Sequence, residues 1–270
     1  MRGALTLLLA GTLSVFSVSA GAQPVTETLG DHGTVDWSSQ VIRAKGIAVP
    51  GGAGGRAGLI RAAELDALRQ ILETVKGMRL SSETLVENYM LSNDVIRTRV
   101  EGVVRNFRRV GDPVYMSDGS IEVTVEMNLR GTGQLFDVLM PTPVGDAPYP
   151  ISPQAPAGNY TGLLVDARGL GLRPAIAPRI LSDNGEVVYG SKIVDRTWAV
   201  EQGMVGYARD PDAARGDERI APNPMFIKAV HATGPNRTDI VISDQDAGKL
   251  NDDGQTPRWL RECRVIVLVD

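Results

Sequence analysis

The chain has 270 residues, of which 43% are hydrophobic, with 28 Lys and Arg against 32 Asp and Glu. A net charge of −4 at pH 7 argues against a nucleic-acid-binding protein, because such proteins gather Lys and Arg to neutralise phosphates. The acidic balance argues equally against tight adsorption to an anionic membrane surface. The length is enough for one large domain or two ordinary ones.

Residues 1–22 have the pattern of a secretory signal peptide, in which Arg2 precedes an apolar run from Ala4 to Val18 and a group of small residues. The apolar run is about 15 residues long, shorter than the roughly 20 that a membrane-spanning helix needs; an uncleaved anchor is the alternative. We therefore expect a protein that starts at Gln23 and lies in the periplasm or at the cell surface. No cysteine stands beside the cleavage site, so lipid anchoring is not expected.

The next segments predict a leader, a strand and a helix. Residues 23–34 are polar and contain glycine, which predicts a flexible leader, and residues 35–49 are β-prone. Residues 56–76 carry apolar side chains at helical spacing and form the clearest helix of the sequence. Because Ala63 and Ala67 are small, this helix is expected to approach a sheet closely.

A second, less regular helical stretch is predicted within 81–104, with Ser92 or Asn93 as a helix cap. Two strands follow, one over about 102–116 and one over 121–129, where apolar and polar residues alternate. An Asp-Gly turn connects them. The order of elements predicts an α+β fold, a small antiparallel sheet with two helices on one face.

The chain is expected to contain two domains, over 35–140 and 159–270. Six prolines in 141–158 predict a semi-rigid linker between them. The second domain is predicted to be mixed and mainly β, with few helices. Its expected elements are a strand over 160–166, a hairpin over 180–190, a long loop over 210–224, a strand or helix over 225–230, a short helix capped by Ser243, and a final strand over 264–269.

Few residues are suited to catalysis. Cys263 is the only cysteine, so no intramolecular disulfide can form, and its strand-like surroundings predict a buried core residue. The only histidines are His32 and His231, too few for a zinc site. An exported hydrolase would need acidic residues to converge with His231 or Ser191. We expect no catalytic residues, no cofactor and no metal.

Two motifs resemble ligand-binding loops and depart from them at the decisive positions. The glycines of Gly51–Gly55 precede a helix, but Arg56–Gly58 follows where a phosphate-binding loop requires Gly-Lys-Ser/Thr. An exported protein also normally has no supply of ATP. Asp244–Asp246 begins like a calcium loop, but Gln255 replaces its bidentate glutamate. We therefore expect Gly51–Gly55 to form a mobile loop and Asp244–Asp246 to form a helix cap.

Large apolar side chains are the remaining candidates for a functional surface. Residues 135–140 can either close the core of the first domain or offer a hydrophobic patch to a partner. The three tryptophans are dispersed, as core or interface anchors often are. The candidate interface residues are Trp37, Leu135, Phe136, Leu139, Trp198 and Trp259.

Within the stretch 42–129, a strand, a helix, a helix end and a turn follow one another in the segments Ala44–Ala48, Arg61–Arg69, Val75–Gly77, Glu101–Val104 and Asp118–Gly119. Through these segments the stretch resembles the bacterial envelope lipoproteins related to flagellar basal-disk protein P and to the N-terminal domain of flagellar ring-assembly protein T. The resemblance covers about a third of the chain. Members of that family are non-enzymatic components that assemble into rings or surface structures, although this chain lacks their lipid-acceptor cysteine.

The resemblance and the export signal together predict a non-enzymatic envelope protein that acts through protein–protein contacts. Its expected partners are other envelope proteins or further copies of itself, in a flagellar or outer-envelope assembly. The alternative is that the second domain binds cell-wall glycan or a small solute.

Overall fold

The computed structural model of the 270-residue chain describes residues 23–51, 54–140, 159–250 and 256–270. The predicted signal peptide and the predicted proline-rich linker lie outside these ranges. Within them, no helix combines the length and the apolar character needed to cross a membrane.

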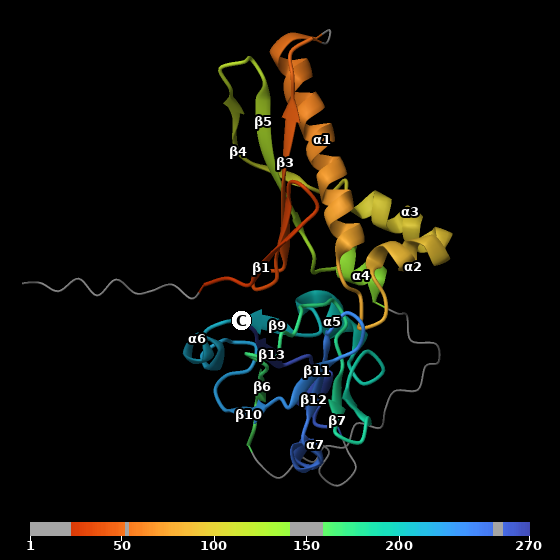
Figure 1. The fold of residues 1–270 in the computed structure, drawn as a ribbon, viewed down its shortest axis with the longest axis vertical. Coiled ribbons are helices and arrows are strands. Elements are labelled where there is room, and N and C mark those ends of the chain that lie inside the picture. Colours follow the sequence, from red (N-terminus) through yellow and green to blue (C-terminus); the bar gives the residue numbers. More distant parts are fainter. Residues whose placement is uncertain (1–22, 52–53, 141–158, 251–255) are drawn as a thin grey trace, which may run out of the picture.

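The first domain is a five-stranded antiparallel sheet with helices against it, as predicted (Figure 1). The long helix α1 (Gly55–Gly77) lies along the central strands β3 and β5 and buries Ala63, Ala67 and Ile71. Alternation along β3 places Ile42 and Ala44 in the core. The strands follow the spatial order β1 (Thr26–Leu29), β2 (Gly33–Asp36), β3 (Val41–Ala48), β5 (Ile121–Asn128) and β4 (Arg108–Tyr115).

The prediction that residues 23–34 form a flexible leader is wrong. Most of this segment belongs to the β1–β2 hairpin, and β2 pairs antiparallel with β3. Val25 is buried, and its carbonyl accepts a hydrogen bond of 2.8 Å from the amide of Trp37. The order comes from long-range pairing, because so short a polar segment has no strong local preference of its own.

Three shorter helices follow α1. They are α2 (Val86–Ser92), α3 (Asp94–Val103) and α4 (Leu135–Leu139). The predicted cap is confirmed, since the side-chain oxygen of Asn93 accepts hydrogen bonds of 3.1 Å from the amides of Val95 and Ile96. Helix α3 extends to Val103, so the following strand begins later than predicted. Val100 and Val103 pack into the core at helical spacing, which favours the longer helix.

The second domain contains two four-stranded sheets and only short helices, so the predicted mixed and mainly β organisation is confirmed. One sheet, ordered β10-β6-β13-β9, is entirely parallel, and the other, β11-β12-β7-β8, is mixed. The strands are β6 (Gly162–Asp166), β7 (Ile180–Ser182), β8 (Val187–Tyr189), β9 (Gly206–Ala208), β10 (Pro224–Lys228), β11 (His231–Thr233), β12 (Asp239–Ile242) and β13 (Val265–Leu268). The helices are α5 (Arg196–Gln202), α6 (Pro211–Arg215), α7 (Asp244–Leu250) and α8 (Arg258–Arg261).

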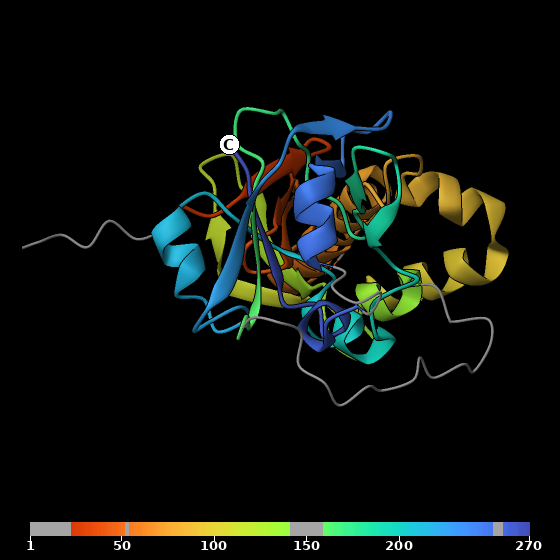
Figure 2. The same cartoon turned by 90° about the horizontal axis from the view of Figure 1, so that it is seen from below.

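The two domains pack end to end and share one continuous hydrophobic core. Helix α1 and strands β3, β4 and β5 extend away from the second domain as an arm, while the β1–β2 hairpin, α4 and α5 lie at the junction (Figure 1). Seen from below, α2 and α3 project on one side of the second domain and α6 lies on the opposite side (Figure 2). The two regions described below are the far end of this arm and the junction between the domains.

Candidate functional site

Most of the residues predicted as interface anchors belong to the chain's own core. Trp198 is 43% exposed on α5. The others are almost completely buried within the single chain, so they form no accessible partner surface. Residues 135–140 therefore close the core of the first domain, which was one of the two interpretations of this segment. The buried members are Trp37, Leu135, Phe136, Leu139 and Trp259.

Trp37 anchors the first domain to the second. Its ring meets the ring of Tyr207 edge-on, with centroids 5.8 Å apart and an interplanar angle of 72°. The indole nitrogen of Trp37 donates to Glu27 over 3.3 Å, and Glu27 is paired with the buried guanidinium of Arg79. Arg79 also donates over 3.2 Å to the carbonyl of Pro174 in the second domain. An edge-to-face aromatic contact, an ion pair and a hydrogen bond to the backbone therefore stabilise the same part of the junction.

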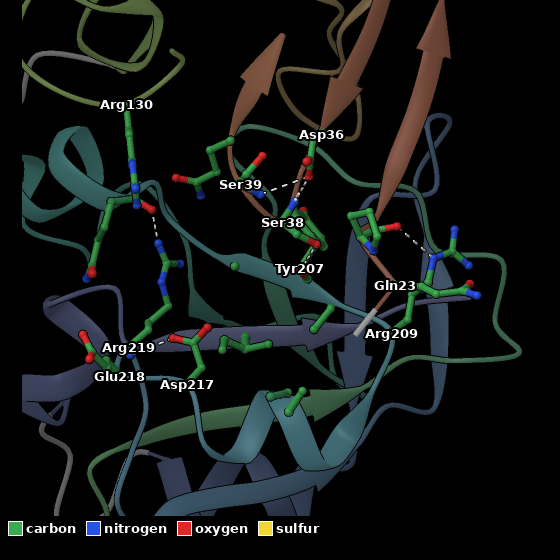
Figure 3. Close-up of a pocket in the computed structure, with 18 residues that line it drawn as sticks. Gln23, Asp36, Ser38, Ser39, Arg130, Tyr207, Arg209, Asp217, Glu218 and Arg219 are labelled. Carbon is green, nitrogen blue, oxygen red and sulfur yellow. Dashed lines mark hydrogen bonds between the residues drawn. The ribbon is translucent and has the colours of Figure 1, made fainter. Parts of the chain in front are cut away.

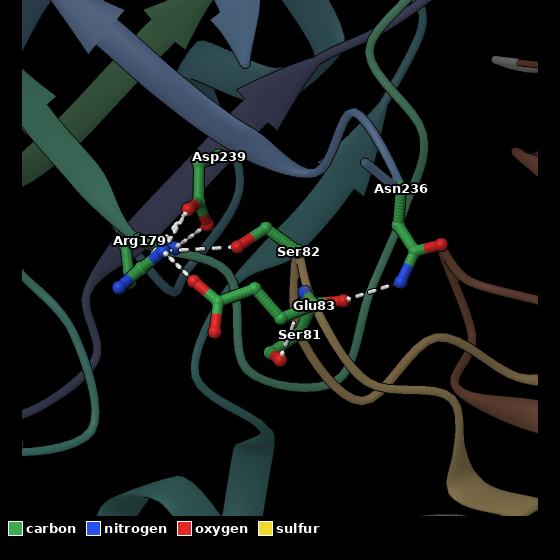
Figure 4. A network of polar contacts seen from close by, with 6 residues as sticks. All are labelled: Ser81, Ser82, Glu83, Arg179, Asn236 and Asp239. Carbon is green, nitrogen blue, oxygen red and sulfur yellow. Dashed lines mark hydrogen bonds and ion pairs between the residues drawn. The ribbon is translucent and has the colours of Figure 1, made fainter. Parts of the chain in front are cut away.

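A second polar network joins the loop after α1 to the mixed sheet (Figure 4). The Nε and Nη2 atoms of Arg179 donate to the carboxylate of Asp239 over 2.9 and 2.6 Å, and Nη2 also donates to Ser82 in the first domain over 2.9 Å. The side chain of Asn236 donates over 3.0 Å to the carbonyl of Ser81. The hydrogen bond to Asp239 raises the pKa of the Arg179 guanidinium. Asp239 is only 1% exposed, so this network also neutralises a buried charge.

The third link connects α4 with α5. Arg196 donates over 2.7 Å both to the carbonyl and to the carboxylate of Asp137. The backbone amide of Gly131 donates over 2.8 Å to the carbonyl of Val200. Three separate attachments and a common core therefore join the first domain, which carries the arm, to the second domain.

The far end of the arm exposes a group of large apolar side chains, which we call the arm tip. Its members are between 42% and 71% exposed, and Ile47 and Val114 both lie opposite Glu122 in the strand register. Strand β4 is the edge of the sheet and pairs only with β5. Exposed apolar groups of this kind often mark a site of protein contact. The arm tip consists of Ile47, Val49, Val114, Tyr115 and Met116.

A cleft of about 690 Å³ opens at the junction between the domains (Figure 3). The first domain supplies the end of the β1–β2 hairpin and Arg130, which follows β5. The second domain supplies strand β9, helix α6 and the loop after it. The lining residues are Gln23, Pro24, Asp36, Ser38, Ser39, Gln40, Arg130, Gln202, Gly206, Tyr207, Ala208, Arg209, Ala213, Ala214, Asp217, Glu218, Arg219 and Ile266.

Side chains of the first domain close part of this cleft against the free edge of β9. The hydroxyl of Ser38 donates to the carbonyl of Tyr207 over 2.9 Å, and the Nε2 atom of Gln40 donates to the carbonyl of Val205 over 3.2 Å. Gln40 holds a left-handed backbone conformation, with φ of 57°, that turns the chain from β2 into β3. These bonds cover an edge strand that would otherwise offer its carbonyls to another chain.

The two residues named for a hydrolase, His231 and Ser191, lie far apart in the second domain. His231 lies on the edge strand β11, and Ser191 follows β8 at the opposite edge of the same sheet. Three strand spacings separate these edges, roughly 14 Å, so the two side chains cannot share a proton directly. Burial raises the pKa of the Cys263 thiol to about 12, as expected of a core cysteine. Among the described residues, no group of His, Cys, Asp and Glu is placed to hold a metal ion.

Asp244–Asp246 forms the start of α7, where the hydroxyl of Ser243 accepts a hydrogen bond of 3.1 Å from the amide of Asp246. The predicted helix cap is therefore confirmed. Neither the arm tip nor the cleft is predicted from the sequence, because both are assembled from segments that are far apart in the chain.

Comparison with known proteins gives a family match for the second domain. Residues 162–270 match the family model described as the second domain of Treponema pallidum Tp0624. A search of curated proteins gave no match. The matched segment begins at the first strand of the second domain, so residues 162–270 are similar to a unit that is itself defined as a domain of another protein.

Proposed function

We propose that this chain is a non-enzymatic envelope protein that acts through contacts with other envelope proteins or with further copies of itself, and that the arm tip is its contact surface. The observation that carries the proposal is the exposure of five large apolar side chains together at the end of the arm. Burial of a fully exposed apolar side chain contributes about 1.5–3 kcal/mol, so a partner that covers these roughly half-exposed side chains gains about half of that for each.

The attachment of the arm supports this role. Binding is weakened when flexible parts must be ordered, and the three links at the junction hold the arm before any partner arrives. The secretory pattern of residues 1–22 and the resemblance of the first domain support a setting in a flagellar or outer-envelope assembly. We therefore propose this cellular setting from the sequence.

Site-specific photo-crosslinking in the producing cell tests the proposal. A photoreactive amino acid replaces Met116 in the arm tip, and a matched variant carries it at Val187, which is 45% exposed on the second domain. We expect a discrete crosslinked species from position 116, with either a copy of the chain or an envelope protein identified by mass spectrometry, and none from position 187.

Light scattering of the purified chain provides the complementary measurement. If the tip joins copies of the chain, Val114→Glu places a charge in the contact and lowers the average mass, whereas Val187→Glu leaves it unchanged. A chain that is strictly monomeric at high concentration and that gives no crosslink from position 116 would exclude the arm tip as a contact surface.

A further inference from the structure

The cleft between the domains has the size and the composition of a small-molecule site. Its volume of about 690 Å³ lies within the range of roughly 300–1,000 Å³ that ligand pockets occupy. Both domains line it, and domain junctions are frequent locations for such sites. The three links described above fix its walls, so the cleft is present before any ligand binds.

Guanidinium groups from both domains gather in this cleft. Arg130 descends from the first domain and Arg219 rises from the second, with their guanidinium groups directed toward one another, while Arg209 lies at the far end (Figure 3). Among the described residues, none of the three forms an ion pair with a carboxylate. Burial lowers the pKa of Arg219, the nearby charge of Asp217 raises it, and repulsion from the charge of Arg130 lowers it. An anion near both groups would relieve that repulsion.

Arg219 is held in place by the backbone. It donates to the carbonyls of Gln202, Gly203 and Val265, the last over 3.3 Å, and these bonds leave part of its guanidinium free. The side chain of Arg130 is exposed, and the structure shows no hydrogen bond from it to a described residue. One arginine is therefore fixed and the other is available, an arrangement suited to binding an anion between them.

The acidic residues of the cleft are partly engaged elsewhere. Asp36 accepts hydrogen bonds of 3.0 Å from the amides of Ser38 and Ser39, and Asp217 accepts one of 2.8 Å from the amide of Arg219. Glu218 is exposed and lies with Asp217 on the wall of the cleft that the second domain supplies (Figure 3). These carboxylates limit the anion to the side of the cleft where Arg130 stands, which favours a small ligand over a polyanion.

One buried acceptor in the cleft has no partner. The Nε2 atom of Gln40 donates to the carbonyl of Val205, which fixes the orientation of the amide, and the Oε1 atom is buried with no hydrogen-bond partner among the described residues. An unsatisfied buried acceptor is costly, and a small movement of the Gln40 amide toward the cleft would let a ligand hydroxyl or N–H group satisfy it.

We propose that the cleft between the domains binds a small hydroxylated organic anion, whose carboxylate or phosphate group lies between Arg130 and Arg219 and whose hydroxyl group donates to Gln40. The class includes sugar acids and sugar phosphates. The site is separate from the arm tip, so its existence does not depend on the protein contact proposed above.

Isothermal titration calorimetry of the full chain with two pairs of probes tests the proposal. Glucuronate is compared with glucose, and glycerol 3-phosphate with glycerol, so that each anion has a neutral counterpart of similar shape. We expect one or both anions to bind with a 1:1 stoichiometry and neither neutral compound to bind. Comparing glucuronate with glycerol 3-phosphate shows whether the preferred group is a carboxylate or a phosphate.

Variants then locate the site. Arg130→Gln is expected to weaken anion binding about tenfold or more, which corresponds to about 1.4 kcal/mol, because one charge-assisted contact is lost. Arg105→Gln changes the net charge equally at an exposed position of the first domain outside the cleft, and it should change the dissociation constant less than about twofold. Thermal unfolding of both variants verifies that they fold.

Two outcomes would overturn the proposal. One is the absence of binding by either anion up to about 10 mM, a concentration far above that of a functional weak site. The other is equal weakening by Arg130→Gln and Arg105→Gln, which would indicate diffuse attraction to the surface rather than a built site.

Discussion

Replacement of Gly46 by alanine tests how closely helix α1 packs on the sheet. Gly46 lies in the middle of β3, and a Cβ atom at this position would lie 2.1 Å from the carbonyl oxygen of Ala63 and 2.2 Å from the amide nitrogen of Ala67. Both atoms belong to the helix backbone, so no side-chain rotation can relieve the contact. The helix would have to move away by about 1.3 Å to restore an ordinary contact of 3.4 Å.

A displacement of that size weakens the packing along the whole helix. A radial gap of 0.5–1 Å already removes a quarter to a half of the dispersion energy between facing atoms, and α1 buries Ile71 and Val75 against the same core. Overpacking ordinarily costs about 1–3 kcal/mol, and because the obstruction here is backbone we expect about 3 kcal/mol or more from Gly46→Ala.

Urea unfolding of the full chain, followed by circular dichroism, measures this effect. With an m-value of about 3 kcal/mol per molar, the midpoint of the first-domain transition should fall by about 1 M in Gly46→Ala. Gly102→Ala is the matched control, because a Cβ at Gly102 meets nothing within 4 Å and the residue lies in helix α3. There alanine should raise stability by up to about 1 kcal/mol. An unchanged midpoint in Gly46→Ala would refute the close approach of helix and sheet.

Three further predictions concern charge and burial. Arg179→Met should lower the free energy of unfolding by about 2 kcal/mol, because Asp239 stays buried without its partner, and adding Asp239→Asn should recover part of the loss in urea unfolding. The pKa of Asp137 is lowered, chiefly by a hydrogen bond from the amide of Gly133. Its contribution to stability is therefore complete above the ordinary Asp pKa and is lost as the pH falls through the lowered value, so the difference in stability between the natural chain and Asp137→Asn should be larger at pH 7 than at about pH 3. An equal difference at both pH values would contradict this. Burial raises the pKa of Cys263 to about 12, so a thiol reagent at about pH 8 should label the folded chain slowly and the urea-unfolded chain at once. Rapid labelling of the folded chain would show instead that the thiol is accessible.

Local patterns in the sequence were sufficient for the elements with strong periodicity. The spacing of apolar residues predicts helix α1 almost to its ends, and the alternation over 121–129 predicts strand β5. The small side chains Ala63 and Ala67 also predict the close approach to the sheet, and both are fully buried there. These features depend on neighbours within a few residues, and the sequence displays such neighbours directly.

The strands over 162–166 and 265–268 were predicted, but the pairing of distant segments was not. The hairpin within 23–34 is ordered because β2 pairs with β3 and because Trp37 packs on Tyr207 of the other domain. Parallel pairing of β6, β10 and β13 requires long crossovers that leave no local signal in the sequence.

The sequence alone determined the class of the two domains, the position of the long helix, the cap at Asn93 and the burial of Cys263, because each of these follows from local spacing or from the preference of one side chain for its surroundings. The tertiary structure decided that most of the tryptophans and residues 135–140 face inward, and it brought Arg130 and Arg219 together from different domains. The physical reason is that surfaces and clefts are formed by residues far apart in the chain, and which of those residues meet depends on how the complete fold packs.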